Sequence, residues 1–383
     1  MKTLISSVND AFTPVLRPHI WRLPTRTGVQ LGWRLGGMTG EAGVAADGRE
    51  PWLALHGGPG GGASPGLLAA FDGARHAVWG PHQRGCVTAG TGRAARLPVT
   101  AMVDDLEALR LALGIARWSV LGGSWGAYLA LAYVRRYPDA VTRVVLRGSF
   151  LAEADDVWGL VRAMPPEVLR RSGLPAPANR GPLTAWLTRV QRVLRFATPA
   201  PAHRQLTQAW LLAEYRCAVR GARRAVLNLP RAADGDVLSS PSAPRLRATW
   251  RDLRRGERRA EVALRTRRPV SVAQLRKVTL QAQLLSRGCD HLLRGALPAW
   301  RAWLASASAQ SSAPSAPRLL LLHGRFDAVC HPKNARRLQQ TLADLAQPPE
   351  MQAMQVQWIH GGHLAHEPAM AQALRQAVRR RAS

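Results

Sequence analysis

The stretch Gly122-Gly123-Ser124-Trp125-Gly126 decides the fold of this chain. It follows an apolar, strand-like run at 118–121 and leads into small and apolar residues at 127–137 that are typical of a helix. A serine in a G-x-S-x-G sequence between a strand and a helix lies on a sharp turn, with its hydroxyl exposed at the helix N-terminus. The pattern therefore predicts a nucleophilic Ser124, although five residues alone also fit a glycine-rich turn with an incidental serine.

Length and composition limit the class of protein. The chain has 383 residues, enough for one large domain with an insertion or for two domains. No run of 18 uncharged apolar residues predicts a membrane span. Asn9 and Asp10 fall where a secretory signal would be apolar, so we expect a cytoplasmic protein. The four cysteines lack C-x-x-C spacing, which argues against a zinc site and a disulfide scaffold. We expect reduced thiols and no metal or cofactor.

The net charge of +29 makes nucleic acids and anionic membranes candidate partners. However, only three of the 53 basic residues are lysines, and the arginines occur throughout an alanine-rich chain. We therefore interpret the arginine excess as a bias of genome composition and not as a surface selected to bind a partner. An arginine-rich cluster at 245–268 is expected to be a solvated surface segment, with adventitious polyanion binding as the alternative. We therefore expect no specific nucleic-acid partner and no membrane partner, and the oligomeric state stays open.

Strand-like runs at 52–55, 76–79, 118–121 and 141–146 alternate with helical patterns such as 102–113. This alternation predicts an α/β fold with a mostly parallel sheet. Helix-rich sequence follows residue 150, and strand and helix patterns return at 318–322, 334–345 and 354–359. We expect the core to comprise 1–150 and 318–383, with a helical cap inserted at 151–317. The Ser-, Ala- and Pro-rich stretch 306–317 is the expected linker back into the core.

Three further motifs each follow a predicted strand. Glycines in His56-Gly57-Gly58-Pro59-Gly60 let backbone N–H groups approach a developing oxyanion, and we expect Gly58 and Trp125 to donate them. Asp327 follows the strand at 318–322, and His363 follows the strand at 354–359. The chain order of serine, aspartate and histidine is the one expected of an α/β-hydrolase.

The chemistry explains why these three residue types occur together. A serine is a poor nucleophile, so His363 must take the proton of Ser124 and return it to the leaving group, while Asp327 fixes the imidazole tautomer. Taken singly, Asp327 also fits a turn or N-cap residue, and His363 a loop histidine beside His360 and His366. The order of all the motifs favours a catalytic triad.

These motifs resemble the proline iminopeptidase family, α/β-hydrolase peptidases that release an N-terminal proline. The resemblance covers HGGPGGG at 56–62, QRG at 83–85, GGSWG at 122–126, RGSFL at 147–151, HGRFDAVC at 323–330 and GGH at 361–363. It implies that Ser124, Asp327 and His363 are the triad and that the inserted helices cap the site. It also implies that Trp210 and Glu214 match a W-x-x-W-E segment, whose glutamate binds the substrate's α-amino group by charge-assisted hydrogen bonding.

The chain departs from the family at several motif positions, including one that binds the amine. His82 stands where the family has the aspartate of DQRG, and Ala213 replaces the second tryptophan of W-x-x-W-E. The helix at 279–286 lacks the second amine-binding glutamate. The resemblance implies a serine aminopeptidase that releases proline or another small N-terminal residue from short peptides. The alternatives are an esterase or amidase without amine recognition, and a non-catalytic protein that binds an anionic partner through its arginines.

Overall fold

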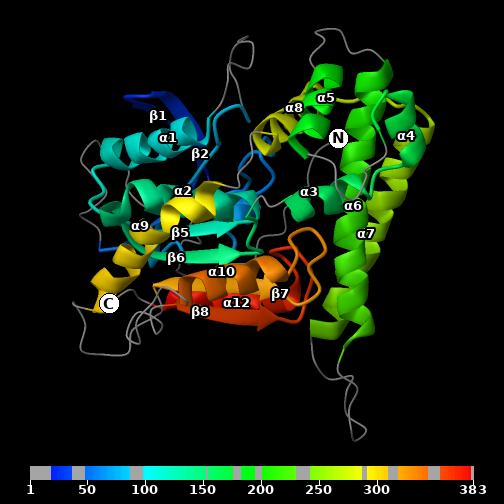
Figure 1. Ribbon diagram of the computed structural model, residues 1–383. Coiled ribbons are helices and arrows are strands. Elements are labelled where there is room, and N and C mark those ends of the chain that lie inside the picture. Colours follow the sequence, from blue (N-terminus) through cyan, green and yellow to red (C-terminus); the bar gives the residue numbers. More distant parts are fainter. Residues whose placement is uncertain are drawn as a thin grey trace, which may run out of the picture.

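A computed structural model describes residues 19–36, 48–86, 98–151, 154–175, 183–194, 201–229, 242–286, 291–308, 318–343 and 354–380. Its centre is an eight-stranded sheet with the strand order β1-β2-β4-β3-β5-β6-β7-β8 (Figure 1). The strands are β1 (His19–Thr25), β2 (Gly28–Leu35), β3 (Glu50–Leu55), β4 (His76–Pro81), β5 (Trp118–Gly123), β6 (Val141–Arg147), β7 (Leu319–Gly324) and β8 (Met354–Ile359). The strands from β4 to β8 along this order pair in parallel.

The predicted α/β fold with a mostly parallel sheet is confirmed, and all six predicted strands are present within a few residues. Strands β1 and β2 were not predicted from the sequence; they form an antiparallel hairpin that joins the sheet through β4. The hairpin forms the edge of the sheet, where Pro24 is tolerated and Ile20 and Val29 stay exposed. Its apolar pattern is therefore weaker than that of a buried strand.

Helices cover both faces of the sheet. Alternate strand residues point to opposite faces, so Leu53 and Leu55 pack with one group of helices, while Trp52 and Ala54 pack with α12 on the other face. The first group is α1 (Val99–Ala112), α2 (Trp125–Arg136), α9 (His291–Ser308) and α10 (Lys333–Ala343). The second face carries α12 (Pro368–Arg379) and a short 3-10 helix, η2 (Pro65–Leu68).

A second group of helices lies between β6 and β7 in the chain and builds a core of its own around Trp158, Trp186 and Trp210. These helices lie together beside the sheet (Figure 1). The helices that contribute to this core are α3 (Ala154–Val161), α4 (Pro166–Arg171), α5 (Leu183–Leu194), α6 (Pro201–Leu227) and α8 (Val272–Leu285), and α7 (Ser242–Arg265) packs along α6.

Helix α9 belongs to the α/β core although it falls within the segment expected to be inserted. Trp300 Nε1 donates a hydrogen bond to Leu131 O and Trp303 Nε1 to Val141 O, both at 3.0 Å. Buried indole rings with satisfied N–H groups fix the helix against α2 and the start of β6. Of the expected linker at 306–317, residues 309–317 lie outside the described residues.

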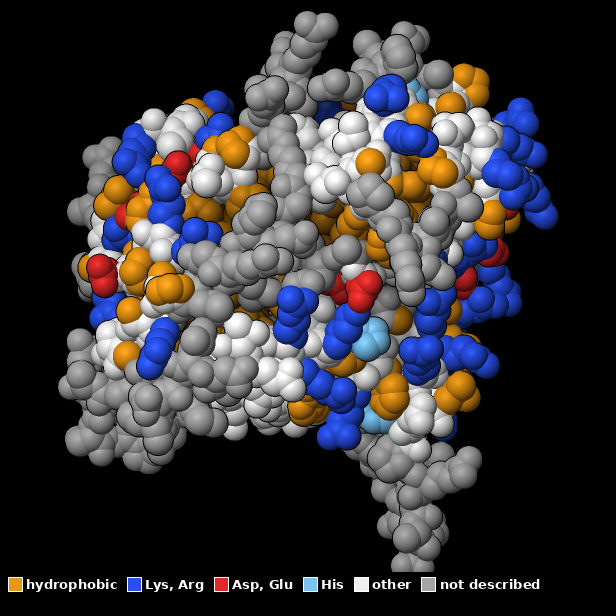
Figure 2. All heavy atoms as spheres, viewed as in Figure 1, with side chains coloured by type: hydrophobic (Ala, Val, Ile, Leu, Met, Phe, Trp, Pro, Cys, Tyr) orange, Lys and Arg blue, Asp and Glu red, His pale blue; other side chains and the backbone are white. Residues whose placement is uncertain are grey.

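The arginine-rich cluster is largely the helix α7, which packs along α6. Arg254 pairs with Glu257 at 2.7 Å, and Arg216 of α6 reaches Glu261 at 3.3 Å. Figure 2 shows basic side chains gathered along this edge of the molecule. In the described part of the chain, every helix is too short or too polar to cross a bilayer.

Candidate active site

Ser124 has the backbone conformation of a strained turn between β5 and α2. Its φ is 55° and its ψ is −121°, and Arg267 is the only other described non-glycine residue with a positive φ. The neighbouring glycines permit this turn, because a β-carbon on Gly126 would lie 2.2 Å from Leu55 O, and one on Gly122 would lie 2.4 Å from Gly126 O. Strain of this kind persists where the surrounding structure enforces it, and it is common at functional sites.

Asp327 and His363 follow the neighbouring parallel strands β7 and β8, which brings them together. His363 Nδ1 lies 2.7 Å from Asp327 Oδ2. The other carboxylate oxygen accepts hydrogen bonds from the N–H groups of Val329 and Cys330, at 2.8 Å and 2.9 Å. Burial acts to raise the pKa of Asp327, but the charge and hydrogen bond of His363 outweigh it and hold this pKa below its usual value. Asp327 is therefore ionised and fixes the orientation of the imidazole.

Cys330 lies between the serine and this pair. Ser124 Oγ is 3.6 Å from Cys330 Sγ, and that sulfur, a carboxylate oxygen of Asp327 and a ring nitrogen of His363 all lie within 4.8 Å of one another. Ser124 and His363, both described, share no hydrogen bond in this arrangement. Such contacts are often long or misaligned before substrate binds.

The same three groups are close enough to hold a metal ion, but their chemistry fits a metal poorly. The Asp327 oxygen and the His363 nitrogen are already engaged with each other. Burial raises the pKa of the Cys330 thiol well above its usual value, so the thiolate that a metal needs is disfavoured.

The glycine loop after β3 is tied to the first turn of α2 by a buried polar chain. Gln83 Nε2 donates to His56 O at 2.8 Å, and Gln83 Oε1 accepts from Trp125 Nε1 at 3.0 Å. The backbone N–H of Gln83 donates to His56 Nε2 at 3.2 Å, so the ring proton is on Nδ1, which donates to Gly57 O at 3.0 Å. Burial lowers the pKa of His56 to about 4, so the ring is neutral.

Two backbone N–H groups, those of Gly58 and Trp125, are available near Ser124. The first N–H groups of a helix have no intrahelical acceptor, and Trp125 is the first residue of α2. Gly58 has a φ of +52°, and no described residue accepts a hydrogen bond from its N–H. A β-carbon on the preceding residue, Gly57, would lie 3.1 Å from Ser124 Cβ, so the loop and the serine are in contact.

His82 fixes the far end of the same loop. Its Nδ1 accepts a hydrogen bond from the N–H of Ala63 at 3.0 Å, and burial lowers its pKa. A neutral ring that accepts from the backbone thus stands at the position where the family carries an aspartate.

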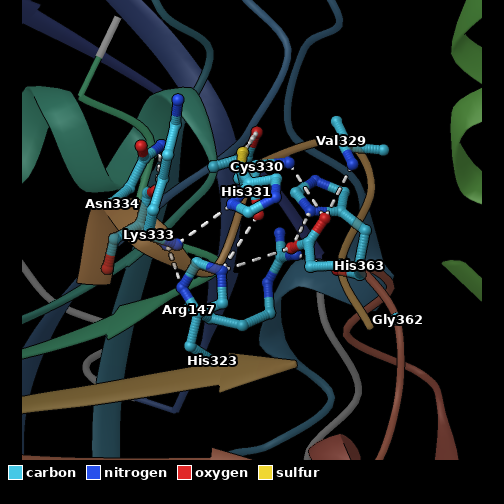
Figure 3. Close-up of polar contacts among 12 residues, drawn as sticks. Arg147, His323, Val329, Cys330, His331, Lys333, Asn334, Gly362 and His363 are labelled. Atoms are coloured by element: carbon cyan, nitrogen blue, oxygen red, sulfur yellow. Dashed lines mark hydrogen bonds and ion pairs between the residues drawn. The ribbon is translucent and has the colours of Figure 1, made fainter. Parts of the chain in front are cut away.

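Two residues that support His363 received no role in the sequence analysis. Arg147 donates a hydrogen bond to the carbonyl of His363, and its guanidinium lies against Gly123, where a β-carbon would be 2.5 Å from Nη2 (Figure 3). The buried Glu367 accepts from the N–H groups of Gly362 and Leu364, and burial raises its pKa. Arg147 lies within the quoted RGSFL motif, whereas Glu367 carries no local signal beyond an acid four residues after His363.

The structure brings Glu214 to the glycine loop but leaves Trp210 away from it. Glu214 Oε2 pairs with Lys277 Nζ at 2.5 Å, and Oε1 accepts from Gln281 Nε2 at 2.9 Å. Both partners lie on α8, which contacts the loop at Gly58. Trp210 precedes Glu214 by one turn of α6 and is fully buried in the core between the helices.

Comparison with known proteins agrees with the fold described above. Residues 51–182 match a family model described as the alpha/beta hydrolase fold. The proline iminopeptidase of Neisseria meningitidis serogroup A is 39% identical over 136 residues, which cover 34% of this chain and 44% of that protein. A probable proline iminopeptidase of Streptomyces coelicolor is 39% identical over 157 residues, covering 37% and 47%. The matched part thus spans less than half the length of either relative.

Among solved structures, a thermophilic esterase from Thermogutta terrifontis superposes with a TM-score of 0.46 and 18% identity, covering 94% of this chain and 97% of that chain. The chain has the α/β-hydrolase fold, and part of it is similar in sequence to the proline iminopeptidases.

Proposed function

We propose that the protein is a serine hydrolase of the proline iminopeptidase type, which releases an N-terminal proline or another small residue from short peptides. The observation that carries this proposal is the strained turn at Ser124, whose Oγ lies 3.6 Å from Cys330 Sγ, a sulfur within 4.8 Å of the hydrogen-bonded atoms of Asp327 and His363. The similarity to proline iminopeptidases supports the choice of substrate.

The proposed reaction proceeds through an acyl-enzyme. His363 Nδ1–H donates to Asp327, so Nε2 serves as the base that takes the proton of Ser124 as its oxygen attacks the substrate carbonyl carbon. The N–H groups of Gly58 and Trp125 hold the oxyanion that forms. His363 returns the proton to the departing amine as the C–N bond breaks. A water molecule then attacks the acyl-enzyme carbonyl with His363 again as the base, and the acyl group leaves Ser124. No metal or cofactor takes part.

We assign α3 to α8 as the cap over this site, since they lie between β6 and β7 in the chain, and all but α7, which packs on α6, contribute to one core of their own. Glu214 is the proposed partner of the substrate's α-amino group, because it lies on the cap and its partners contact the glycine loop. Trp210 stabilises α6 by packing in the core between the cap helices. We also propose that the protein works in the cytoplasm, where thiols such as those of the described Cys86, Cys217 and Cys330 stay reduced.

The test is hydrolysis of L-proline 4-nitroanilide beside its N-acetyl counterpart, with Ser124→Ala as the control. Release of nitroaniline from the free-amine substrate alone, lost in Ser124→Ala, is the expected result. A wild-type enzyme that cleaves neither anilide and hydrolyses no short-chain aryl ester would contradict the proposed chemistry.

One observation favours a second candidate, an esterase or amidase on the same scaffold. The carboxylate of Glu214 is already paired with Lys277, and its other neighbour on α8 is the uncharged Gln281. This candidate predicts Ser124-dependent hydrolysis of 4-nitrophenyl butyrate with no turnover of the proline anilide.

A further inference from the structure

The carboxylate of Glu214 is occupied by the protein's own donors. Lys277 Nζ lies 2.5 Å from Oε2, and Gln281 Nε2 lies 2.9 Å from Oε1. Lys277 and Gln281 are four residues apart on α8, so both side chains project from the same face of that helix. The pair of Glu214 and Lys277 carries no net charge, and it takes the place that a substrate cation would need at this carboxylate.

This cluster borders the loop that is proposed to hold the oxyanion. A β-carbon on Gly58 would lie 3.7 Å from Gln281 Nε2 and 4.0 Å from Lys277 Cε, and one on Gly60 would lie 2.9 Å from Lys277 Cα. The preceding Gly57 contacts Ser124. Two consecutive glycines therefore connect the nucleophile to the Glu214 cluster, which places this carboxylate beside the acyl part of a bound substrate.

Gln281 offers a second acceptor at the same place. Its side chain is 5% exposed, and Oε1 is buried with no hydrogen-bond donor among the described residues. Glu214 fixes the orientation of the amide, because the reverse orientation would set two acceptors against each other. A buried acceptor without a partner is costly, so this oxygen is prepared for a donor that the protein itself does not supply.

The free N-terminal amine of proline carries two N–H groups when it is protonated. One can bind a carboxylate oxygen of Glu214 and the other Gln281 Oε1, but only after Lys277 has left, because two cations on one partly buried carboxylate repel each other. The side chain of Lys277 is 25% exposed, and its long flexible stem can carry the ammonium out into water.

We propose that Lys277 competes with the substrate's amine for the acceptor oxygens of Glu214 and Gln281. The inference rests on the proposed function and deepens it: Lys277 determines specificity by weakening the preference for a free N-terminus over a blocked one. Lys277 acts only on the free amine, since a blocked acyl group brings no charge to Glu214.

The test compares Lys277→Met with Arg276→Met, a control that removes the same charge from an exposed neighbour on the same helix. The readout is the ratio of kcat/KM for proline 4-nitroanilide to that for its N-acetyl counterpart. We expect this ratio to rise at least about tenfold in Lys277→Met, equivalent to about 1.4 kcal/mol, and to stay unchanged in Arg276→Met. Gln281→Leu should lower the ratio. An unchanged or lower ratio in Lys277→Met would overturn the proposal.

A binding measurement separates this inference from the proposed activity. Prolinamide is titrated calorimetrically into Ser124→Ala and into the double variant Ser124→Ala/Lys277→Met, so no turnover is needed. Tighter binding by about tenfold in the double variant supports the competition, even if the wild-type enzyme proves to cleave no peptide. Equal affinities refute it, even if the enzyme proves to be an aminopeptidase.

Discussion

Replacement of Gly148 by alanine tests the arrangement of the catalytic pair directly. Gly148 follows β6 with a φ of +56°, and a β-carbon there would lie 3.2 Å from Asp327 Oδ2 and 3.2 Å from both His363 Nδ1 and Cε1. Carbon contacts are optimal at about 3.5–4.0 Å. The new methyl group must therefore displace the Asp327–His363 pair by a few tenths of an ångström.

The variant has two separable effects. An L-residue in the left-handed region costs about 1–2 kcal/mol of stability, and the displaced imidazole lowers kcat. A misplacement of about 1 Å can cost about 100-fold in rate, so we expect a loss of about 10-fold to 100-fold in the Ser124-dependent hydrolysis of an activated ester.

Gly173→Ala is the matched control, because Gly173 has a φ of +67° and a β-carbon there meets no atom of the described residues within 4 Å. Both variants are measured by chemical denaturation and by steady-state hydrolysis of 4-nitrophenyl butyrate. Both should lose similar stability, and only Gly148→Ala should lose activity. If the two variants keep the same activity, whether it is unchanged or equally reduced, the assignment of Asp327 and His363 to catalysis is refuted.

Three further outcomes are expected. Asp327→Asn should lower kcat by about 10⁴-fold with little loss of fold, because the amide favours the wrong tautomer of His363; near-normal kcat would contradict the triad. His56 is neutral when folded, with its pKa lowered from 6.5 to about 4, so the unfolded chain binds the extra proton and stability falls as the pH drops from about 6.5 to about 4. Its share is about 3 kcal/mol, and denaturation of His56→Gln should show a flatter pH dependence over that range. Glu367→Gln replaces one of the two acceptor oxygens by an amide NH2, which then faces a backbone N–H such as that of Leu364. It should lower the free energy of unfolding by about 1–3 kcal/mol and reduce kcat more than it changes KM, and a change confined to KM would argue against a role in placing His363.

The sequence by itself determined the local turn at Ser124 and the order of the motifs. Glycines on either side of Ser124 encode a backbone that only small residues allow, and an apolar run before them encodes the strand. Because parallel strands end at one edge of a sheet, residues that follow such strands meet there without further information. Asp327 and His363 could therefore be expected at one edge of the sheet from their positions in the chain, and in the structure His363 Nδ1 lies 2.7 Å from Asp327 Oδ2.

Only the tertiary structure decided which side chains surround these motifs. The contact of Glu214 with Lys277 joins helices 63 positions apart, and it depends on how α6 and α8 pack rather than on any local pattern. The edge hairpin of β1 and β2 gave too weak an apolar alternation to be predicted, since its outer side chains stay in water. Motifs fix backbone geometry over a few residues, whereas the side chains that surround Glu214 are set by packing between segments that are distant in the chain.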